Sequence, residues 1–99
     1  MMPGGLTAAK PATPEIQQLA EKVKPQLEAR ENKSYPVFTA TEYRSQVVAG
    51  TNYFIKMDVG HGEYVHIRVF QALPCNNGDI SLTGYQTGKT ASDPLSYFG

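Results

Sequence analysis

The chain has 99 residues, nine of them basic and nine acidic, so its formal charge at neutral pH is zero. This length suits a single domain with one core, and we expect one domain over residues 1–99. A neutral chain exerts no strong field on polyanions, and it holds no apolar run long enough to cross a bilayer. We therefore expect neither nucleic acid nor a membrane as partner.

The first ten residues lack the basic and apolar regions of a secretory signal, and Cys75 is the only cysteine, so no disulfide can form within the chain. For a complete chain, both observations favour the cytoplasm, with the nucleus as a second location.

Residues 1–12 show neither helical nor strand periodicity. Pro3 and Pro11 favour extended backbone, while Gly4 and Gly5 allow a close approach to another surface. We expect an extended, mobile N-terminal arm; a frayed terminus without a role is the alternative.

Thr13 followed by Pro14 predicts a helix start, with a threonine N-cap and a proline where no N–H is needed. The helix should run to about Asn32, and Pro25 should kink it on its solvent side; a helix broken at Lys24 is the alternative. One helical face is apolar, and it carries Ile16, Leu19, Ala20, Val23 and Leu27.

Strand patterns follow over residues 37–48, 51–59, 63–72 and 80–87. In the third run, Val65, Ile67 and Val69 should face inward, while His66 and Arg68 face solvent. Gly84 is a candidate β-bulge that resets the register of the last strand, and residues 94–98 should dock back on the sheet.

One helix followed by meandering strands indicates an α+β fold, in which the helix covers one face of an antiparallel sheet. In a meander, alternate turns lie at the same end of the sheet. The turn at residues 48–50 and the loop at residues 73–78 should therefore be neighbours.

The turn Gln46-Val47-Val48-Ala49-Gly50 is unusual because its tip is apolar, whereas hairpin tips mostly carry polar residues or glycine. Apolar groups held at a tip suggest a surface that meets a partner. The alternative is that Val47 and Val48 form the buried end of the preceding strand.

Catalytic and metal sites are poorly supported. Cys75 with His61 or His66 has no evident orienting third group or oxyanion hole, and one cysteine with two histidines lacks the ligand spacing of metal sites. We expect no enzyme activity, no cofactor and no metal, but a binding module with apolar loops at one edge.

The order and spacing of several short pieces resemble the stefins, the disulfide-free intracellular branch of the cystatin family. These pieces are Met2-Pro3-Gly4-Gly5, residues 11–15, residues 45–56, Leu73-Pro74 and residues 82–87. The resemblance implies a cystatin-like antiparallel sheet of four to five strands wrapped around one N-terminal helix. It also implies tight, reversible inhibition of papain-like cysteine proteases, including cathepsins.

The resemblance further implies a wedge, made of the arm and two loops, that enters the protease cleft without reacting there. Protease-binding residues would then be Met2, Pro3, Gly4, Gly5, Gln46, Val47, Val48, Ala49, Gly50, Leu73 and Pro74.

A second hypothesis concerns assembly. β-Branched residues resist turn geometry, so Val47–Gly50 is a candidate strained hinge. We expect a monomer, but opening this hinge would permit a domain-swapped dimer that does not inhibit. Cys75 would be either a bystander or the site of a disulfide-linked dimer.

Overall fold

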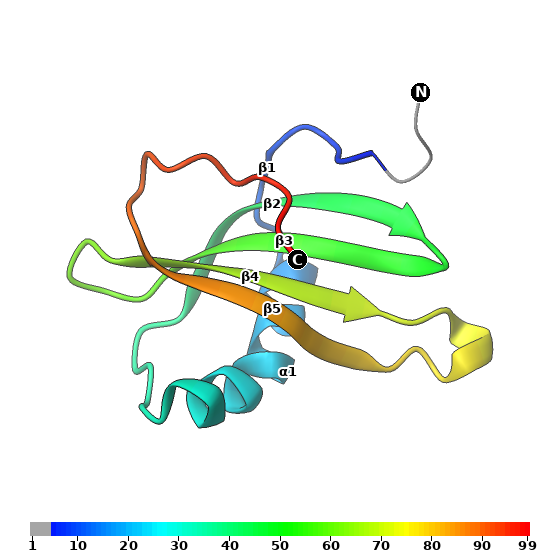
Figure 1. Cartoon of the computed structure of the whole chain (residues 1–99), viewed down its shortest axis with the longest axis horizontal. Coiled ribbons are helices and arrows are strands. Elements are labelled where there is room, and N and C mark those ends of the chain that lie inside the picture. Colours follow the sequence, from blue (N-terminus) through cyan, green and yellow to red (C-terminus); the bar gives the residue numbers. More distant parts are fainter. Residues whose placement is uncertain (1–4) are drawn as a thin grey trace.

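The computed structural model describes residues 5–99, which form one helix and a five-stranded antiparallel sheet. The elements are β1 (Lys10–Pro11), α1 (Pro14–Glu31), β2 (Thr39–Val48), β3 (Gly50–Asp58), β4 (Tyr64–Gln71), a short 3-10 helix η1 (Pro74–Asn76) and β5 (Ile80–Lys89). The strands lie in the order β1-β2-β3-β4-β5, so consecutive strands are neighbours (Figure 1). The predicted α+β fold is confirmed.

Helix α1 begins and ends as its sequence predicts. The Thr13 hydroxyl accepts a hydrogen bond from the Ile16 N–H at 3.2 Å, and Asn32 caps the other end with a left-handed backbone at φ 54°. The helix continues through Pro25, which is exposed to solvent. The alternative of a helix broken at Lys24 is therefore wrong.

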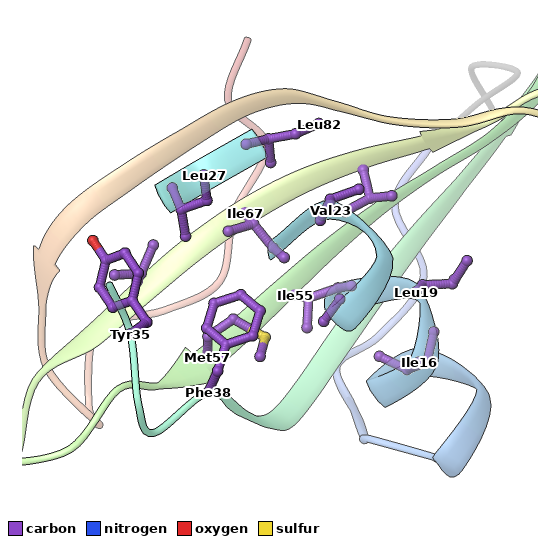
Figure 2. Packing of buried hydrophobic residues seen from close by; sticks show 13 residues of the cluster. Ile16, Leu19, Val23, Leu27, Tyr35, Phe38, Ile55, Met57, Ile67 and Leu82 are labelled. Carbon is purple, nitrogen blue, oxygen red and sulfur yellow. The ribbon is translucent and has the colours of Figure 1, made fainter. Parts of the chain in front are cut away.

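The core lies between α1 and one face of the sheet. The helix contributes its predicted apolar stripe, and Figure 2 shows these side chains facing those of the strands. The buried residues of the strands are Ile55, Met57, Val65, Ile67, Val69 and Leu82, joined by Tyr35 and Phe38 from the connection after the helix.

Helix side chains also bind backbone groups where the strands are irregular. β2 shifts register between Ala40 and Glu42, and there the Ala40 N–H donates to Gln17 Oε1 at 2.7 Å. In β5, the Leu82 N–H donates to Gln26 Oε1 at 3.0 Å, and its carbonyl accepts from Arg30 at 3.0 Å. Such bonds satisfy polar groups that the sheet leaves unpaired.

The predicted bulge at Gly84 is present. Arg68 pairs with Gly84 but Val69 pairs with Leu82, so β5 carries one extra residue at this point. Because of this shift, Ile80, Leu82 and Tyr85 all pack on the core that faces the helix.

The face of the sheet that lies away from α1 is covered, contrary to the prediction that His66 faces solvent. His66 is only 1% exposed and Arg68 is half-buried, because residues 90–99 return across this face. Leu95 and Phe98 pack there against Phe54, which confirms that the C-terminal segment docks back on the sheet.

Three cationic side chains on this outer face hold the C-terminal segment by its carbonyl groups. Arg44 donates to Leu95, Lys56 to Ala91 and Arg68 to Phe98, at 2.7, 2.9 and 3.1 Å. Lys56 also forms an ion pair with Glu42 at 3.2 Å. Hydrogen bonds from charged donors are stronger than those between neutral groups. They offset the cost of covering three cationic side chains with residues 90–99.

His66 lies within this covered face, opposite Lys56 on the neighbouring strand, and its Nε2 is buried without a hydrogen-bond partner among residues 5–99. Burial and the Lys56 ammonium lower the pKa of His66 to about 4. Lys89 acts in the same direction, whereas Asp93 and Glu42 act weakly against it.

We predict that this histidine makes the protein less stable in acid. As pH falls from 6.5 to about 4, the unfolded chain takes up the proton before the folded one, so the free energy of unfolding falls, by at most about 3 kcal/mol. Urea unfolding across this range measures the loss. The variant His66→Gln should show a flatter pH profile, and a profile parallel to that of the wild type would contradict this role.

Candidate functional site

The two loops singled out in the sequence lie at the same end of the sheet, as predicted. Thr51 of β3 pairs with Gln71 of β4, which places the β2–β3 turn beside the β4–β5 loop (Figure 1). We call the surface made by residues 46–50 and 72–78 the loop edge. An open hollow of about 400 Å³ lies between its two parts, lined by Gly50, Thr51, Gln71, Ala72, Leu73, Pro74, Asn77 and Gly78.

The β2–β3 turn is tight, and its tip is exposed. Val48 pairs directly with Gly50, so Ala49 alone connects the two strands. The exposed fractions of Val47 and Val48 are 68% and 45%, although both belong to β2. The interpretation of exposed apolar groups is therefore confirmed. The alternative is right that Val47 and Val48 end the preceding strand and wrong that they are buried.

Gly50 is the residue that permits this turn. Its φ is +118°, and a Cβ at this position would lie 2.6 Å from the carbonyl oxygen of Gln71 and 2.7 Å from a ring atom of Phe70. Neither the backbone conformation nor the space suits a side chain. The close packing of Gly50 on β4 also fixes the turn against the neighbouring strand.

The side chain of Gln46 forms a hydrogen bond across the hairpin that ends in this turn. Its Oε1 accepts a hydrogen bond of 2.9 Å from the side-chain amide of Asn52, its partner across the strands, and Asn52 is 5% exposed. The side chain of Gln46 is therefore engaged within the hairpin, unlike those of Val47 and Val48.

The β4–β5 loop closes on itself. The N–H groups of Asn77 and Gly78 donate to the carbonyls of Pro74 and Leu73, each at 3.0 Å. Asn77 and Gly78 both have positive φ, at 70° and 61°, which lets the chain reverse direction here. This closure holds Leu73 and Pro74 exposed beside the first turn, with Cys75 exposed next to them.

The N-terminal arm runs along β2 toward the loop edge. Lys10 pairs with Tyr43, and the Thr7 N–H donates to the Ser45 carbonyl at 2.9 Å. Because the two segments are antiparallel, each step from Thr7 toward the N-terminus leads toward the tip of β2, and the described part of the arm runs in that direction (Figure 1). The described part of the arm, from residue 5 onward, is extended as predicted, but from Thr7 to Pro11 it is docked on β2.

Three predicted site residues, Met2, Pro3 and Gly4, lie outside the described residues. The other eight lie along the loop edge or lead toward it.

The loop edge is uncharged, and its exposed apolar groups are Val47, Val48, Leu73 and Pro74. Residues 46–51 and 71–78 contain no aspartate, glutamate, lysine, arginine or histidine. Covering this edge with a partner would therefore desolvate no side-chain charge of this edge, which favours association through shape and apolar contact.

Catalysis and metal binding find no support among residues 5–99. His61 and Cys75 lie beyond opposite ends of β4, whose eight residues span about 26 Å. His66 is buried on the outer face. The described part of the chain holds no cluster of three or more potential metal ligands and no helix suited to cross a membrane.

Comparison with known proteins identifies the family. The family model for the Cystatin domain matches residues 4–92. This chain belongs to the cystatin family. It is 56% identical over 98 residues to Cystatin-A of Felis catus, which covers 99% of this chain and all of that protein.

Other relatives of this cystatin are as similar over the same length. Leukocyte cysteine proteinase inhibitor 1 of Sus scrofa is 60% identical over 98 residues, covering 99% of this chain and 95% of that protein. Cystatin-B of Bos taurus is 56% identical over 98 residues, covering 99% of this chain and all of that protein. The predicted resemblance to the stefins is confirmed, and the chain is a stefin-type cystatin.

Some residues that line the hollow of this cystatin escaped sequence reasoning. Thr51, Gln71 and Ala72 line the hollow only because of the register between β3 and β4, which periodicity does not fix. Asn77 and Gly78 carry a turn signal, since both residue types tolerate positive φ, and the meander predicts their loop beside the first turn. The sequence does not indicate that these two residues line the hollow.

We predict that Gly50→Ala lowers the free energy of unfolding by roughly 2–4 kcal/mol, because it combines positive-φ strain with a clash against β4. Gly62→Ala is the matched control, since Gly62 has φ +72° and a Cβ at that position would have no atom within 4 Å, and it should cost only about 1 kcal/mol. Urea unfolding of both variants measures the difference. Equal losses would contradict the role assigned to the packing of Gly50 on Gln71.

Proposed function

We propose that this cystatin is a tight-binding, reversible and non-covalent inhibitor of papain-like cysteine proteases of the cathepsin type. The observation that carries the proposal is the loop edge, where two closed, uncharged turns with exposed apolar residues lie side by side. The name of the porcine relative, a cysteine proteinase inhibitor 60% identical over 98 residues, supports the same activity. We place the activity in the cytoplasm, with the nucleus as a second location.

In this proposal the loop edge enters the protease cleft as a wedge. Val47, Val48 and Ala49 would cover the catalytic cysteine, while Leu73 and Pro74 would cover the primed side. Gln46 would act from within, by holding the hairpin through Asn52. Gly50 would act by keeping the turn against β4.

The arm would fill the other side of the cleft. Gly4 and Gly5 would let the backbone lie close to the enzyme on the non-primed side, and Met2 and Pro3 would occupy apolar subsites. The direction of the arm along β2, toward the tip of the first turn, supports this assignment.

The geometry of the first turn supports inhibition without cleavage. Cysteine proteases cut peptide bonds in extended segments, which must lie along the cleft. In this turn the chain reverses over Ala49 alone, so it offers no extended bond to the catalytic thiolate. No covalent intermediate would form, and the inhibitor would be released intact.

Rigidity supports tight binding. Protease and inhibitor pairs typically bury about 1,600 Å² in total, and their affinity depends on how little each partner must be ordered on binding. Both turns are closed by backbone contacts within the cystatin itself. Little conformational entropy would therefore be lost in the loops when the complex forms.

The central experiment is titration of papain with wild-type cystatin and with Val48→Asp. We expect Val48→Asp to weaken inhibition at least about a hundredfold, because an unpaired carboxylate would be buried against the enzyme. Val37→Asp is the matched control, since Val37 is 44% exposed against 45% for Val48 but lies against Gly60 in the turn that follows β3. It should inhibit like the wild type.

A second arm of this experiment tests the non-covalent mode. Papain whose catalytic cysteine carries a small blocking group should still bind the cystatin, as measured by calorimetry. Loss of all binding to blocked papain, or equal inhibition by Val48→Asp and wild type, would overturn the proposed mechanism.

Domain exchange is a second candidate, favoured by the single-residue connection between β2 and β3. If the turn around Ala49 opened, the two strands could continue as one and pair with a second copy of the chain. Such a dimer would lack the tip formed by Val48 and Gly50. It would therefore lose half of the loop edge.

We predict that any exchanged dimer, separated by size-exclusion chromatography, fails to inhibit papain and regains inhibition on conversion to monomer. Monomer and dimer fractions are assayed at equal chain concentration. A dimer as active as the monomer would show that the first turn remains closed or is not needed.

A further inference from the structure

Arg44 connects the two ends of the chain. Its Nε donates to the Thr7 carbonyl in the N-terminal arm at 2.8 Å, and its Nη1 donates to the Leu95 carbonyl in the C-terminal segment at 2.7 Å. Arg44 belongs to β2, four residues before Val48. One half-buried guanidinium therefore holds both segments against the strand that ends in the first turn.

Further contacts fix the arm at the same point. The Thr7 N–H donates to the Ser45 carbonyl at 2.9 Å, and the Ser45 N–H donates to the Thr7 hydroxyl at 3.1 Å. Leu6 packs against the outer-face cluster that includes Leu95 and Phe54. Residues 6 and 7 are thus held by β2 on one side and by the C-terminal segment on the other.

We propose that Arg44 is a positioning residue for protease inhibition, which acts by anchoring the N-terminal arm at Thr7. This inference rests on the proposed function, because it assigns the arm's placement in the cleft to a residue outside the loop edge. The C-terminal segment takes part, since the same guanidinium binds its Leu95 carbonyl.

Chain geometry explains why the anchor matters. Extended backbone covers at most about 3.5 Å per residue, so residues 1–5 can reach no more than roughly 18 Å from Leu6. If the remaining contacts of residues 6 and 7 open once the Arg44 bonds are lost, the next attachment is β1 at Lys10 and Pro11. Residues 5–9 would then have to be ordered again on binding, and fixing even one residue's backbone costs about tenfold in affinity.

The guanidinium suits this task better than an ammonium group. Its planar fork presents several N–H donors in fixed directions, so one side chain can serve two carbonyls on different segments. In Arg44→Lys, the charge remains but a single point donor cannot reproduce both bonds in this geometry.

The test is a double-mutant cycle with papain. Arg44→Ala is measured in the full chain and in a chain lacking residues 1–5, and we expect it to weaken inhibition about tenfold in the first and not at all in the second. Arg30→Ala is the control, because Arg30 also donates to one backbone carbonyl, that of Leu82 at 3.0 Å, but lies on α1. It should leave inhibition unchanged in both chains.

Amide hydrogen exchange provides a readout that does not depend on papain. Arg44→Ala should reduce protection of the Thr7 and Ser45 N–H groups, while the amides shared by β3 and β4 stay protected. Should Arg44→Ala fail to fold, Arg44→Lys replaces it, with loss expected in the same two amides.

The outcomes separate this inference from the function on which it rests. An equal loss in full and truncated chains, no loss in either, or unchanged protection of Thr7 would each overturn the role of Arg44. Wild-type cystatin that fails to inhibit papain would instead overturn the proposed function, and the exchange measurement would still decide whether Arg44 anchors the arm.

Discussion

The antiparallel register of β2, β3 and β4 is the constraint on which the candidate site depends. Consecutive strands pair side by side, so the turn after β2 and the loop after β4 must fall at the same end of the sheet. The pairing of Thr51 with Gln71 then fixes their relative height. A shift of one residue would turn the exposed valines of the first turn toward the other face and separate Gly50 from β4.

Both faces of this sheet are covered by the chain itself, which leaves its ends for contact with partners. Helix α1 covers one face with an apolar stripe, whereas residues 90–99 cover the other through a mixture of Phe54, Leu95 and cations that bind carbonyls. The second cover is polar because the segment is too short and irregular to satisfy its own backbone groups. Arg44, Lys56 and Arg68 bind carbonyl groups of this segment instead. This explains why β2, β3 and β4 each carry a cationic residue on the face that lies away from the helix.

Periodicity predicts the helix, the strands and the sheet face that packs on the helix. It does not predict that the other face of the sheet is also covered. The helical stripe from Ile16 to Leu27 and the inward residues of β4 follow from spacing alone, because each repeats at the period of its element. Alternation predicts His66 in solvent because it separates the two faces of a strand without showing what covers the second face. The cover, residues 90–99, has no period, and neither do the docked residues of the arm. The apolar residues of the first turn can be predicted, because a hairpin tip ordinarily carries polar residues or glycine. The residues that line the hollow cannot, because their position depends on the register between strands.

The two loops become ordered when the domain folds, whereas a free arm would become ordered only when a partner binds. Gly50 packed on Gln71 and the closed loop from Leu73 to Gly78 acquire their order when the domain folds, so a partner meets them already in place. An arm attached only at β1 would leave several residues to be fixed during binding, at a cost of about 1–2 kcal/mol each. Arg44 moves part of that cost from binding to folding, because its bonds to Thr7 and Leu95 form within the free protein. Preorganisation of the arm is therefore coupled to the C-terminal segment, although that segment belongs to neither loop.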